Sequence, residues 1–587
     1  MYRRQFLRVL GAAAGWSLGG SATRSFAMAP SAERNRPPNV VLVITDDQGY
    51  GDLSCHGNPI LHTPNLDALY RQSVRLTDFH VSPTCAPTRA SLMTGRYCNR
   101  TGVWHTIMGR SLLRRDEVTM ADVFAAGGYR TGVFGKWHLG DNYPFRPQDR
   151  GFQEILVHGG GGVGQTPDYW GNDYFDDTYW HNGMPGKHKG YCTDVWFDAA
   201  MCFIETSCDR PFFAYLATNA PHSPYNVAER YSGLYKGREA PDAGFYGMIA
   251  NIDENMGRLM DRLKSLGLEE NTVLIFMTDN GTAAGFQGGK GFNAAMRGTK
   301  GSEYDGGHCV PCFIRWPAGG LGGGKDVGRL TAHIDLLPTL IELCGLPRPM
   351  GVKLDGTSIL PLLREQEGGW PDRVLVADSQ RIEHPQKWRQ CAVMTDRWRL
   401  INGRELYDIR GDPGQKNDLS GTRAEVVQEL RGAYEKWWGD VSQRFDEYCE
   451  IVIGSDRENP SRLTCHDWHD ADVAPWNQTH ILQGIEGNGF WAVEIAHAGE
   501  YEFALCRWPR EVAQPINAAV AGGRAIRATK ARLRIGDVDL DKAVAADARE
   551  VVFRILLQPG KVRLQTWFTD EDGASRGAYY VYAARVS

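Results

Sequence analysis

Short apolar runs set the strongest limit on how this chain of 587 residues can fold. The run over residues 39–44 consists almost entirely of β-branched and other apolar residues, and residues 272–278 have the same character. Such unbroken runs are typical of strands that are buried on both faces of a parallel sheet. Residues 130–135 and 211–217 are two further candidates. The sequence therefore predicts four buried strands.

Amphipathic stretches lie between these runs. Apolar residues recur at helical spacing over residues 242–266, directly before the 272–278 strand, and residues 116–126 lead into the 130–135 strand. Strands that alternate with helices favour a parallel sheet covered on both faces. We therefore expect an α/β fold with a large, mainly parallel sheet sandwiched by helices.

The composition excludes other classes of protein. Hydrophobic residues make up 42% and charged residues 23% of the chain, which is ordinary for a globular protein. Beyond the N-terminus no apolar run reaches about 18 residues, so we expect no stable membrane insertion. The net charge is -5, so no basic field marks a nucleic-acid partner. The 13 cysteines are odd in number and their spacing defines no disulfide connectivity.

The N-terminus resembles a bacterial twin-arginine export signal. The pair Arg3-Arg4 is followed by a short, Gly-rich apolar stretch and by small residues that end at Ala27. We predict a signal peptide over residues 1–27 and a periplasmic or secreted mature protein. A disordered terminus or a membrane anchor is the alternative, although the apolar stretch is short for a membrane span.

Oxygen-bearing side chains follow two of the predicted strands. Asp46 and Asp47 follow the first run, and Asp279 and Asn280 follow the run over 272–278. A lone aspartate after a strand is commonly a turn former, but ligands bind at the carboxyl ends of parallel strands. Carboxylates brought together repel unless a cation lies between them. Hard oxygen donors suit Ca²⁺ or Mg²⁺ better than Zn²⁺, and Ca²⁺ tolerates irregular cages best.

A cysteine stands at the start of a predicted short helix. Pro87 suits the first helical turn and Gly95 suits the C-cap, so we expect a helix over residues 88–94. Cys85 would then lie at the helix N-terminus, where free N–H groups favour an anion, and Arg89 would reach the same anion. A buried structural thiol is the common alternative for a cysteine.

The run from Cys85 through Pro87 and Arg89 to Arg96 resembles the signature of the type I (formylglycine-dependent) sulfatase family of the alkaline-phosphatase superfamily. The likeness covers about residues 38–440. Its other segments are residues 135–140, 220–222, 278–281, 300–307 with 310–311, 333–339 and 355–358. In this family the motif cysteine is oxidised to Cα-formylglycine, whose hydrate is the nucleophile.

The resemblance implies a metal site and a maturation partner. Asp46, Asp47, Asp279 and Asn280 would hold one Ca²⁺ per chain, with the modified Cys85 as a further ligand. The formylglycine would require a formylglycine-generating or sulfatase-maturating enzyme.

The resemblance also implies roles for five basic side chains. Arg89 and Lys136 would orient the diol, and Lys136, Lys300 and His222 would bind the sulfate oxygens. One diol oxygen would attack sulfur, and the sulfated covalent intermediate would break when His138 removes a proton from the second hydroxyl. His222 or Lys300 would protonate the leaving oxygen, and we favour His222.

The chain is expected to contain three parts after the signal: a catalytic α/β domain (38–370), a small antiparallel C-terminal subdomain with a helix (371–442), and an added accessory β-rich domain (445–587). Thr422 and Glu425 read as a capping box that opens the subdomain's helix, which runs to Trp438. Two predicted hairpins, 491–506 and 551–568, favour a β-sandwich-like domain that either binds carbohydrate or only walls the cleft.

Residues 158–197 are rich in glycine and aromatic residues. We expect a long irregular segment that is either a lid over the site or decoration, and aromatic rings there suit contact with sugar rings. Trp104 and His105 have the same status.

We therefore expect a sulfatase acting on a sulfated polysaccharide or oligosaccharide. The alternatives are a simple arylsulfatase, a phosphomonoester or phosphonate hydrolase of the same superfamily, and an inactive sugar-binding protein. Intact Cys85, Arg89, His138 and His222 argue against the last.

Overall fold

β1 (Asn39–Thr45) is a central strand of a ten-stranded sheet and is buried along its whole length. The computed structural model describes residues 36–587 other than 208, 367 and 369, so the predicted signal peptide lies outside the described residues. Alternate β1 side chains, such as Leu42 and Val43, join apolar clusters on opposite faces of the sheet. A strand packed on both faces needs an apolar residue at every position, which explains the unbroken run.

The sheet is parallel at its centre and contains antiparallel pairs on both sides of that centre. Strands β9, β1, β8, β4 and β5 pair in parallel, whereas β12, β6 and β7 run antiparallel to their neighbours. The predicted mainly parallel sheet is therefore confirmed. In spatial order the strands are β13 (Lys325–Val327), β2 (Val74–Leu76), β12 (Cys312–Arg315), β9 (Thr272–Thr278), β1, β8 (Phe212–Ala217), β4 (Arg130–Gly135), β5 (Glu154–Val157), β6 (Thr178–His181) and β7 (Met184–Lys187).

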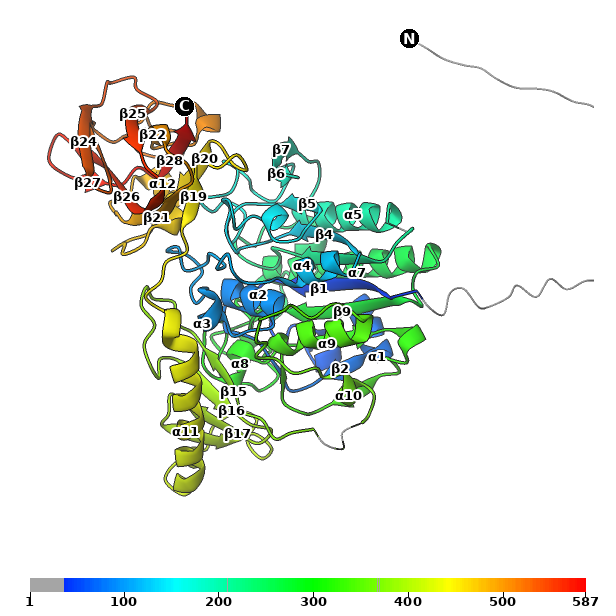
Figure 1. Ribbon diagram of the computed structural model, residues 1–587. Coiled ribbons are helices and arrows are strands. Elements are labelled where there is room, and N and C mark those ends of the chain that lie inside the picture. The colour runs from blue at the N-terminus through cyan, green and yellow to red at the C-terminus, as the bar shows by residue number, and fades with distance from the viewer. Residues whose placement is uncertain (1–35, 208, 367, 369) are drawn as a thin grey trace, which may run out of the picture. The chain divides into compact units, whose positions relative to one another are not determined.

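Helices cover both faces of this sheet (Figure 1). Apolar residues of α1 (Pro64–Gln72), α5 (Cys192–Glu205) and α7 (Ala243–Ser265) pack on one face. Those of α2 (Cys85–Thr94), α4 (Met120–Ala126) and α9 (Leu336–Cys344) pack on the other. Short elements complete this part: α3 (Cys98–Thr101), α6 (Glu229–Ser232), α8 (Asp305–His308), α10 (Leu360–Leu363), β3 (Phe79–His80) paired with β14 (Thr331–Ala332), and β10 (Phe286–Gln287) paired with β11 (Lys290–Gly291).

Two helix boundaries differ from the sequence-based expectation. α4 begins at Met120, because Thr119 accepts a hydrogen bond from the Asp122 backbone and forms a capping box there. The helix expected over 88–94 is α2, which begins three residues before its predicted start, at Cys85.

The aromatic segment 158–197 is irregular, as expected, only as far as residue 177. It contains β6, β7 and the start of α5. Tyr179 and Trp196 are fully buried against the sheet, and their ring centroids are 4.2 Å apart. Trp104 is also buried, at 1% exposure. These rings are core residues because burying large aromatic surfaces stabilises the fold.

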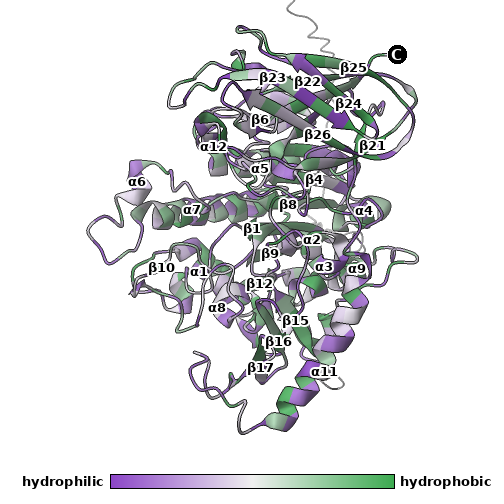
Figure 2. Cartoon of the chain, turned by 90° about the vertical axis from the view of Figure 1, so that its left-hand side faces the viewer, coloured by the Kyte–Doolittle hydropathy of each residue, from purple (hydrophilic) through white to green (hydrophobic). Residues whose placement is uncertain are grey.

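A small antiparallel sheet and a helix follow. The sheet consists of β15 (Leu375–Asp378), β16 (Cys391–Met394), β17 (Trp398–Ile401) and β18 (Glu405–Asp408), and α11 (Ala424–Val441) packs on it. Figure 2 shows both hydrophobic and hydrophilic colours along α11, as expected for a helix with one buried side. The predicted capping box is wrong: Arg423 is the N-cap residue, and the Thr422 hydroxyl donates to Leu419 O.

The C-terminal part consists of two sheets around one apolar cluster, which confirms a β-sandwich. One sheet has the order β19 (Ile451–Ile453), β21 (Phe490–Ile495), β26 (Gly560–Asp570), β23 (Ala528–Ile535) and β24 (Val538–Ala543), with β27 (Ser575–Arg576) paired to β26. The other has the order β20 (Ser461–Thr464), β28 (Tyr580–Arg585), β22 (Gly499–Cys506) and β25 (Val551–Leu557). α12 (Gln478–Gln483) lies in a connection.

Both predicted hairpins are wrong. β21 and β22 belong to different sheets, and so do β25 and β26. Each turn therefore crosses from one sheet to the other. Period-two alternation identifies a strand with one buried face, but it does not identify the neighbour with which that strand pairs.

No described helix combines the length and the apolar character needed to cross a membrane.

We predict that Gly135→Ala destabilises the protein. Gly135 has φ +109°, and a Cβ there would lie 2.0 Å from the carbonyl oxygen of Ala217. Backbone overlap cannot be relieved by a side-chain rotation, so we expect a loss of about 3 kcal/mol in the free energy of unfolding, measured by urea denaturation. Gly128→Ala is the control, because Gly128 has φ +82° but no atom within 4 Å of the added Cβ. Equal losses for both variants would contradict the steric explanation.

Candidate active site

The register between β1 and β9 places two acidic segments side by side. Thr45 of β1 pairs with Thr278 of β9, so Asp46-Asp47 and Asp279-Asn280 leave the sheet at the same level. The Asp47 backbone N–H then donates to Asp279 Oδ1 at 3.0 Å. The backbone at Asp47 is left-handed, with a φ of 69°.

The next strands deliver basic residues to the same edge. Gly135, the last residue of β4, pairs with Ala217, the last residue of β8. Lys136 follows β4 directly, and a short loop after β8 leads to His222. The Asp46 backbone N–H donates to Ala220 O at 3.1 Å, which ties this loop to the end of β1.

Each of three carboxylates at this edge contacts a positively charged side chain. Lys136 Nζ lies 2.6 Å from Asp46 Oδ2, and both side chains are fully buried. Arg89 Nη2 donates to Asp279 Oδ2 at 2.9 Å. Because Arg89 also donates to Lys136 O at 3.2 Å, it links α2 to the ends of both β4 and β9.

Lys300 contacts both carboxylate oxygens of Asp47, at 2.6 and 2.7 Å. Burial opposes ionisation of Asp47, but Lys300, His222 and Lys136 outweigh it and hold the pKa of Asp47 below its usual value. The same carboxylate raises the pKa of Lys300 against the effect of burial. The two groups are therefore charged at neutral pH.

The acidic segments fit a cation with oxygen ligands. Ligand atoms of Asp46, Cys85 and Asp279 all lie within 4.8 Å of one another. Asp46 Oδ1 and Asn280 Oδ1 are buried and have no hydrogen-bond partner among the described residues. Burial and the charge of Asp46 raise the pKa of Asp279 to about 7. A divalent cation would satisfy the free oxygens and relieve this repulsion, so the donor set fits Ca²⁺.

Cys85 lies at the N-terminus of α2, beside these carboxylates. It is 2% exposed, and burial raises the pKa of its thiol to about 11. The group is therefore a neutral thiol at neutral pH, and each cysteine that the structure describes is unpaired. A buried neutral thiol is a weak nucleophile because the thiolate is the reactive form.

Both predicted histidines lie near these basic groups. His138 Nε2 lies 2.9 Å from Thr106 O and donates to it, while its Nδ1 is buried without a described partner. Burial, with the charge of Lys136, lowers the pKa of His138 well below its usual value. His222 Nδ1 donates to Ser223 O at 2.7 Å, and its Nε2 lies 3.8 Å from Asp47 Oδ2. Burial lowers the pKa of His222 to about 4.

Two supporting residues were missed by the sequence-based prediction. Tyr174, from the aromatic segment, donates through its hydroxyl to His222 O at 3.0 Å. His466, from the C-terminal β-sandwich, has its ring centroid 6.3 Å from that of His138, and its carbonyl accepts from Met108 N at 2.8 Å. His466 lies in a His-rich stretch, residues 465–469, but outside the resemblance, so the sequence offered only a compositional signal.

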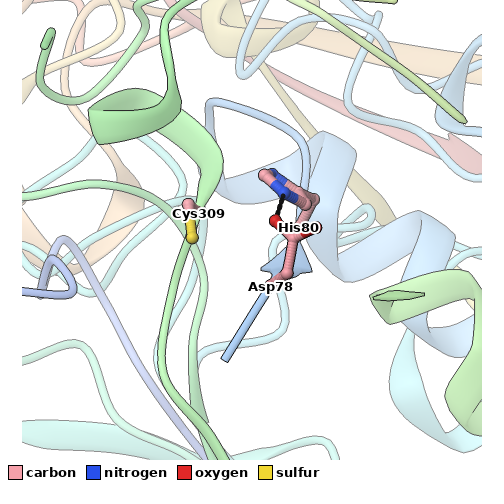
Figure 3. Close-up of side chains that lie close together, drawn as sticks. All are labelled: Asp78, His80 and Cys309. Atoms are coloured by element: carbon pink, nitrogen blue, oxygen red, sulfur yellow. Dashed lines mark hydrogen bonds and ion pairs between the residues drawn. The ribbon is translucent and has the colours of Figure 1, made fainter. Parts of the chain in front are cut away.

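A second cluster consists of residue types that can bind a metal, but a positively charged side chain of the protein already contacts it. Figure 3 shows Asp78 in contact with His80, and Cys309 on a neighbouring segment. His80 Nε2 lies 2.8 Å from Asp78 Oδ1. The guanidinium of Arg399 lies 2.7 Å from Asp78 Oδ1 and 3.1 Å from His80 Nε2. We therefore interpret this cluster as an internal ion-pair network that connects β17 to the segment containing β3.

We predict that Arg89→Met lowers stability more than the loss of an exposed ion pair. The substitution leaves the buried Asp279 carboxylate without its guanidinium partner. We expect a loss of about 3 kcal/mol in urea denaturation with chelator present. The control Arg554→Met removes an exposed pair with Glu502 and should cost below about 1 kcal/mol. Equal effects would show that Arg89 is not needed to balance the buried charge.

Known proteins match this chain over the region that carries the site. The sulfatase family model matches residues 38–346, and a model described as "N-sulphoglucosamine sulphohydrolase, C-terminal" matches residues 300–437. Arylsulfatase A of Homo sapiens is 34% identical over 376 residues, which cover 59% of this chain and 71% of that protein. N-acetylgalactosamine-6-sulfatase of Mus musculus is 30% identical over 357 residues, covering 56% of this chain and 66% of that protein.

Solved structures agree with this assignment. The crystal structure of Ps i-CgsB is 28% identical, has a TM-score of 0.64, and covers 71% of this chain and 95% of that chain. The same protein is also known in complex with k-i-k-neocarrahexaose, with a TM-score of 0.63. The chain described here belongs to the sulfatase family and is an enzyme that hydrolyses sulfate esters.

Proposed function

We propose that this sulfatase removes sulfate from a sulfated polysaccharide or oligosaccharide, using a formylglycine made from Cys85 and one Ca²⁺ per chain. The convergence of Cys85 with Asp46 and Asp279 carries the proposal, because their ligand atoms lie within 4.8 Å of one another. Asp47 and Asn280 would complete the Ca²⁺ ligand set.

The charges at the site favour an anionic substrate once a divalent cation is bound. The carboxylates of Asp46, Asp47 and Asp279 are paired with Lys136, Lys300 and Arg89. These six charges balance, so Ca²⁺ would leave the site with a net positive charge. Fixed positive charges in a buried site stabilise the charge that develops on sulfate oxygens during transfer.

A formylglycine hydrate at position 85 would supply one hydroxyl to attack sulfur and a second hydroxyl whose deprotonation releases sulfate from the covalent intermediate. Arg89, one turn along α2, would orient that group together with Lys136. Lys136 and Lys300 would bind the sulfate oxygens, with His222 beside them. The modification is also favoured by burial, which keeps the unmodified thiol neutral and therefore a weak nucleophile.

The two histidines present different ring nitrogens to the site. His138 donates its Nε2 hydrogen to Thr106 O, so the lone pair of Nδ1 is free to accept a proton, and its lowered pKa keeps it neutral. We assign it as the base. His222 presents Nε2 to the site because Nδ1 donates to Ser223 O.

His222 is neutral while the site is empty, since burial lowers its pKa to about 4. A bound sulfate monoanion would raise that pKa and make His222 the donor to the leaving oxygen. Lys300 is the alternative donor.

The carbohydrate substrate is supported by the β-sandwich and by relatives. Ps i-CgsB binds k-i-k-neocarrahexaose, and another relative is an N-acetylgalactosamine-6-sulfatase. We further propose export to the periplasm or beyond by the twin-arginine-type signal, maturation by a formylglycine-generating or sulfatase-maturating enzyme, and the division of the chain into parts 38–370, 371–442 and 445–587.

We predict that active protein carries formylglycine at position 85. Mass spectrometry of the peptide spanning Cys85 should show an aldehyde in place of the thiol, and Cys85→Ala should abolish turnover of 4-nitrophenyl sulfate. Cys98→Ala is the control, because Cys98 is also a buried, unpaired thiol near α2. An unmodified thiol in fully active protein would refute the proposed nucleophile.

The same preparation distinguishes the rival activities. Sulfate and phosphate monoesters differ in charge, and the match to sulfatases favours the sulfate monoanion as substrate. We expect a higher kcat/KM for 4-nitrophenyl sulfate than for 4-nitrophenyl phosphate, and turnover of sulfated oligosaccharides in a glycan screen. A higher kcat/KM for the phosphate would favour the phosphomonoester hydrolase alternative.

We also predict one Ca²⁺ per chain by elemental analysis. Chelation should abolish turnover and lower the thermal midpoint, since a ligand that binds only the folded state at about 100 times its Kd contributes about 2.7 kcal/mol. Asp46→Asn should reduce the metal content. Asp78→Asn is the matched control, because Asp78 belongs to the Arg399 network and should leave the metal content unchanged. Full Ca²⁺ content in Asp46→Asn would contradict the ligand assignment.

A further inference from the structure

A cavity of about 490 Å³ lies between the sulfatase-family part of the chain and the C-terminal β-sandwich. Trp180 of β6 and Asp141 line one side, and Arg462 of β20, Glu511 and Tyr582 of β28 line the other. Its volume falls within the range of about 300–1,000 Å³ that is typical of small-molecule sites. Its lining residues are distinct from the proposed catalytic and metal residues, although Trp137 and Gly140 flank His138 in sequence.

The three arginines that line the cavity are matched in number by three carboxylates, and each arginine already has a partner. Arg146 Nε contacts Asp149 at 2.7 Å, and Arg510 contacts Glu550 at 3.1 Å. Arg462 stacks 5.2 Å from the Trp180 ring, lies 3.7 Å from Glu511, and donates to Pro167 O. A sulfate group is bound well by an unpaired guanidinium with a free fork of donors. These arginines are committed to other partners, so the lining does not favour an anion.

The other lining groups suit hydroxyls and apolar ring faces. Trp137, Tyr169, Trp180 and Tyr582 provide aromatic walls. Asp141 accepts one hydrogen bond, from Gly160 N at 3.0 Å, so its carboxyl group retains acceptor capacity. The cavity combines these rings with aliphatic residues such as Ile155 and with polar groups such as Asn142, and such a mixture suits a small polar ligand.

We propose that this cavity binds an uncharged saccharide unit of the carbohydrate chain, apart from the sulfate that is cleaved. The inference rests on the proposed carbohydrate substrate and adds a second contact with it. The β-sandwich thus contributes to substrate binding, because one side of the cavity belongs to it.

The test is calorimetric titration of the full mature protein with desulfated neocarrahexaose, cellohexaose and mannohexaose. Excess inorganic sulfate is present to compete for the catalytic centre. We expect at least one of these uncharged saccharides to bind at one site per chain. Trp180→Ala removes an aromatic wall and Glu511→Gln removes a paired carboxylate, and each should weaken binding by about 10-fold.

Matched controls separate these effects from general destabilisation. Trp398→Ala removes another half-buried tryptophan, on which Arg397 stacks at 4.6 Å, and Glu502→Gln removes another ion-paired glutamate, the partner of Arg554. Both controls should bind like the wild type. Glu511→Gln keeps the test valid if Trp180→Ala does not fold.

The inference is overturned if none of the three saccharides binds, if the cavity variants bind as tightly as the wild type, or if sulfate displaces the ligand. Turnover of 4-nitrophenyl sulfate is measured separately in the same preparation. Turnover without saccharide binding refutes the cavity assignment alone, whereas binding without turnover refutes the proposed reaction alone.

Discussion

The site depends on the pairing of three buried carboxylates with three cations at one edge of the sheet. Taking an ion out of water costs several kcal/mol, and only an opposite charge at close range offsets that cost. Strand register supplies the required closeness, since Thr45 and Thr278 pair directly and each precedes an acidic segment. Arg89 then fixes α2, and with it Cys85, against the ends of β4 and β9. The position of the proposed nucleophile therefore depends on charge balance.

The sequence predicted well those features that are encoded locally. Strands buried on both faces are apolar at every position, so β1 and β9 were identified, and residues at their ends were expected to meet. The family resemblance then pointed to Arg89 and Lys300, which lie far from these strands in sequence but contact the acidic segments in the structure. The roles of these residues remain predictions.

The sequence failed where the outcome depends on distant partners. Alternation in β21 and β22 revealed one buried face on each strand, but not that the two strands belong to opposite sheets. Thr422 has the residue type of a cap, yet the helix begins after Arg423. The aromatic rings of residues 158–197 were expected to suit sugar contact, whereas the burial of Tyr179 and Trp196 depends on the packing of α5 on the sheet. His466 could not be found, because its position beside His138 depends on contacts between the sandwich and the loop at Met108.

The topology of the sandwich has a consequence for the order in which the chain matures. β20 directly precedes the stretch that carries His466, and it pairs with β28, which is formed by residues 580–585. Cys465 N also donates to Tyr579 O at 2.9 Å. During synthesis, β20 leaves the ribosome long before this partner exists. The wall beside His138 therefore closes only after β28 has emerged. Biosynthesis thus passes through a stage in which the sheet core can fold while the proposed catalytic pocket is still open on that side.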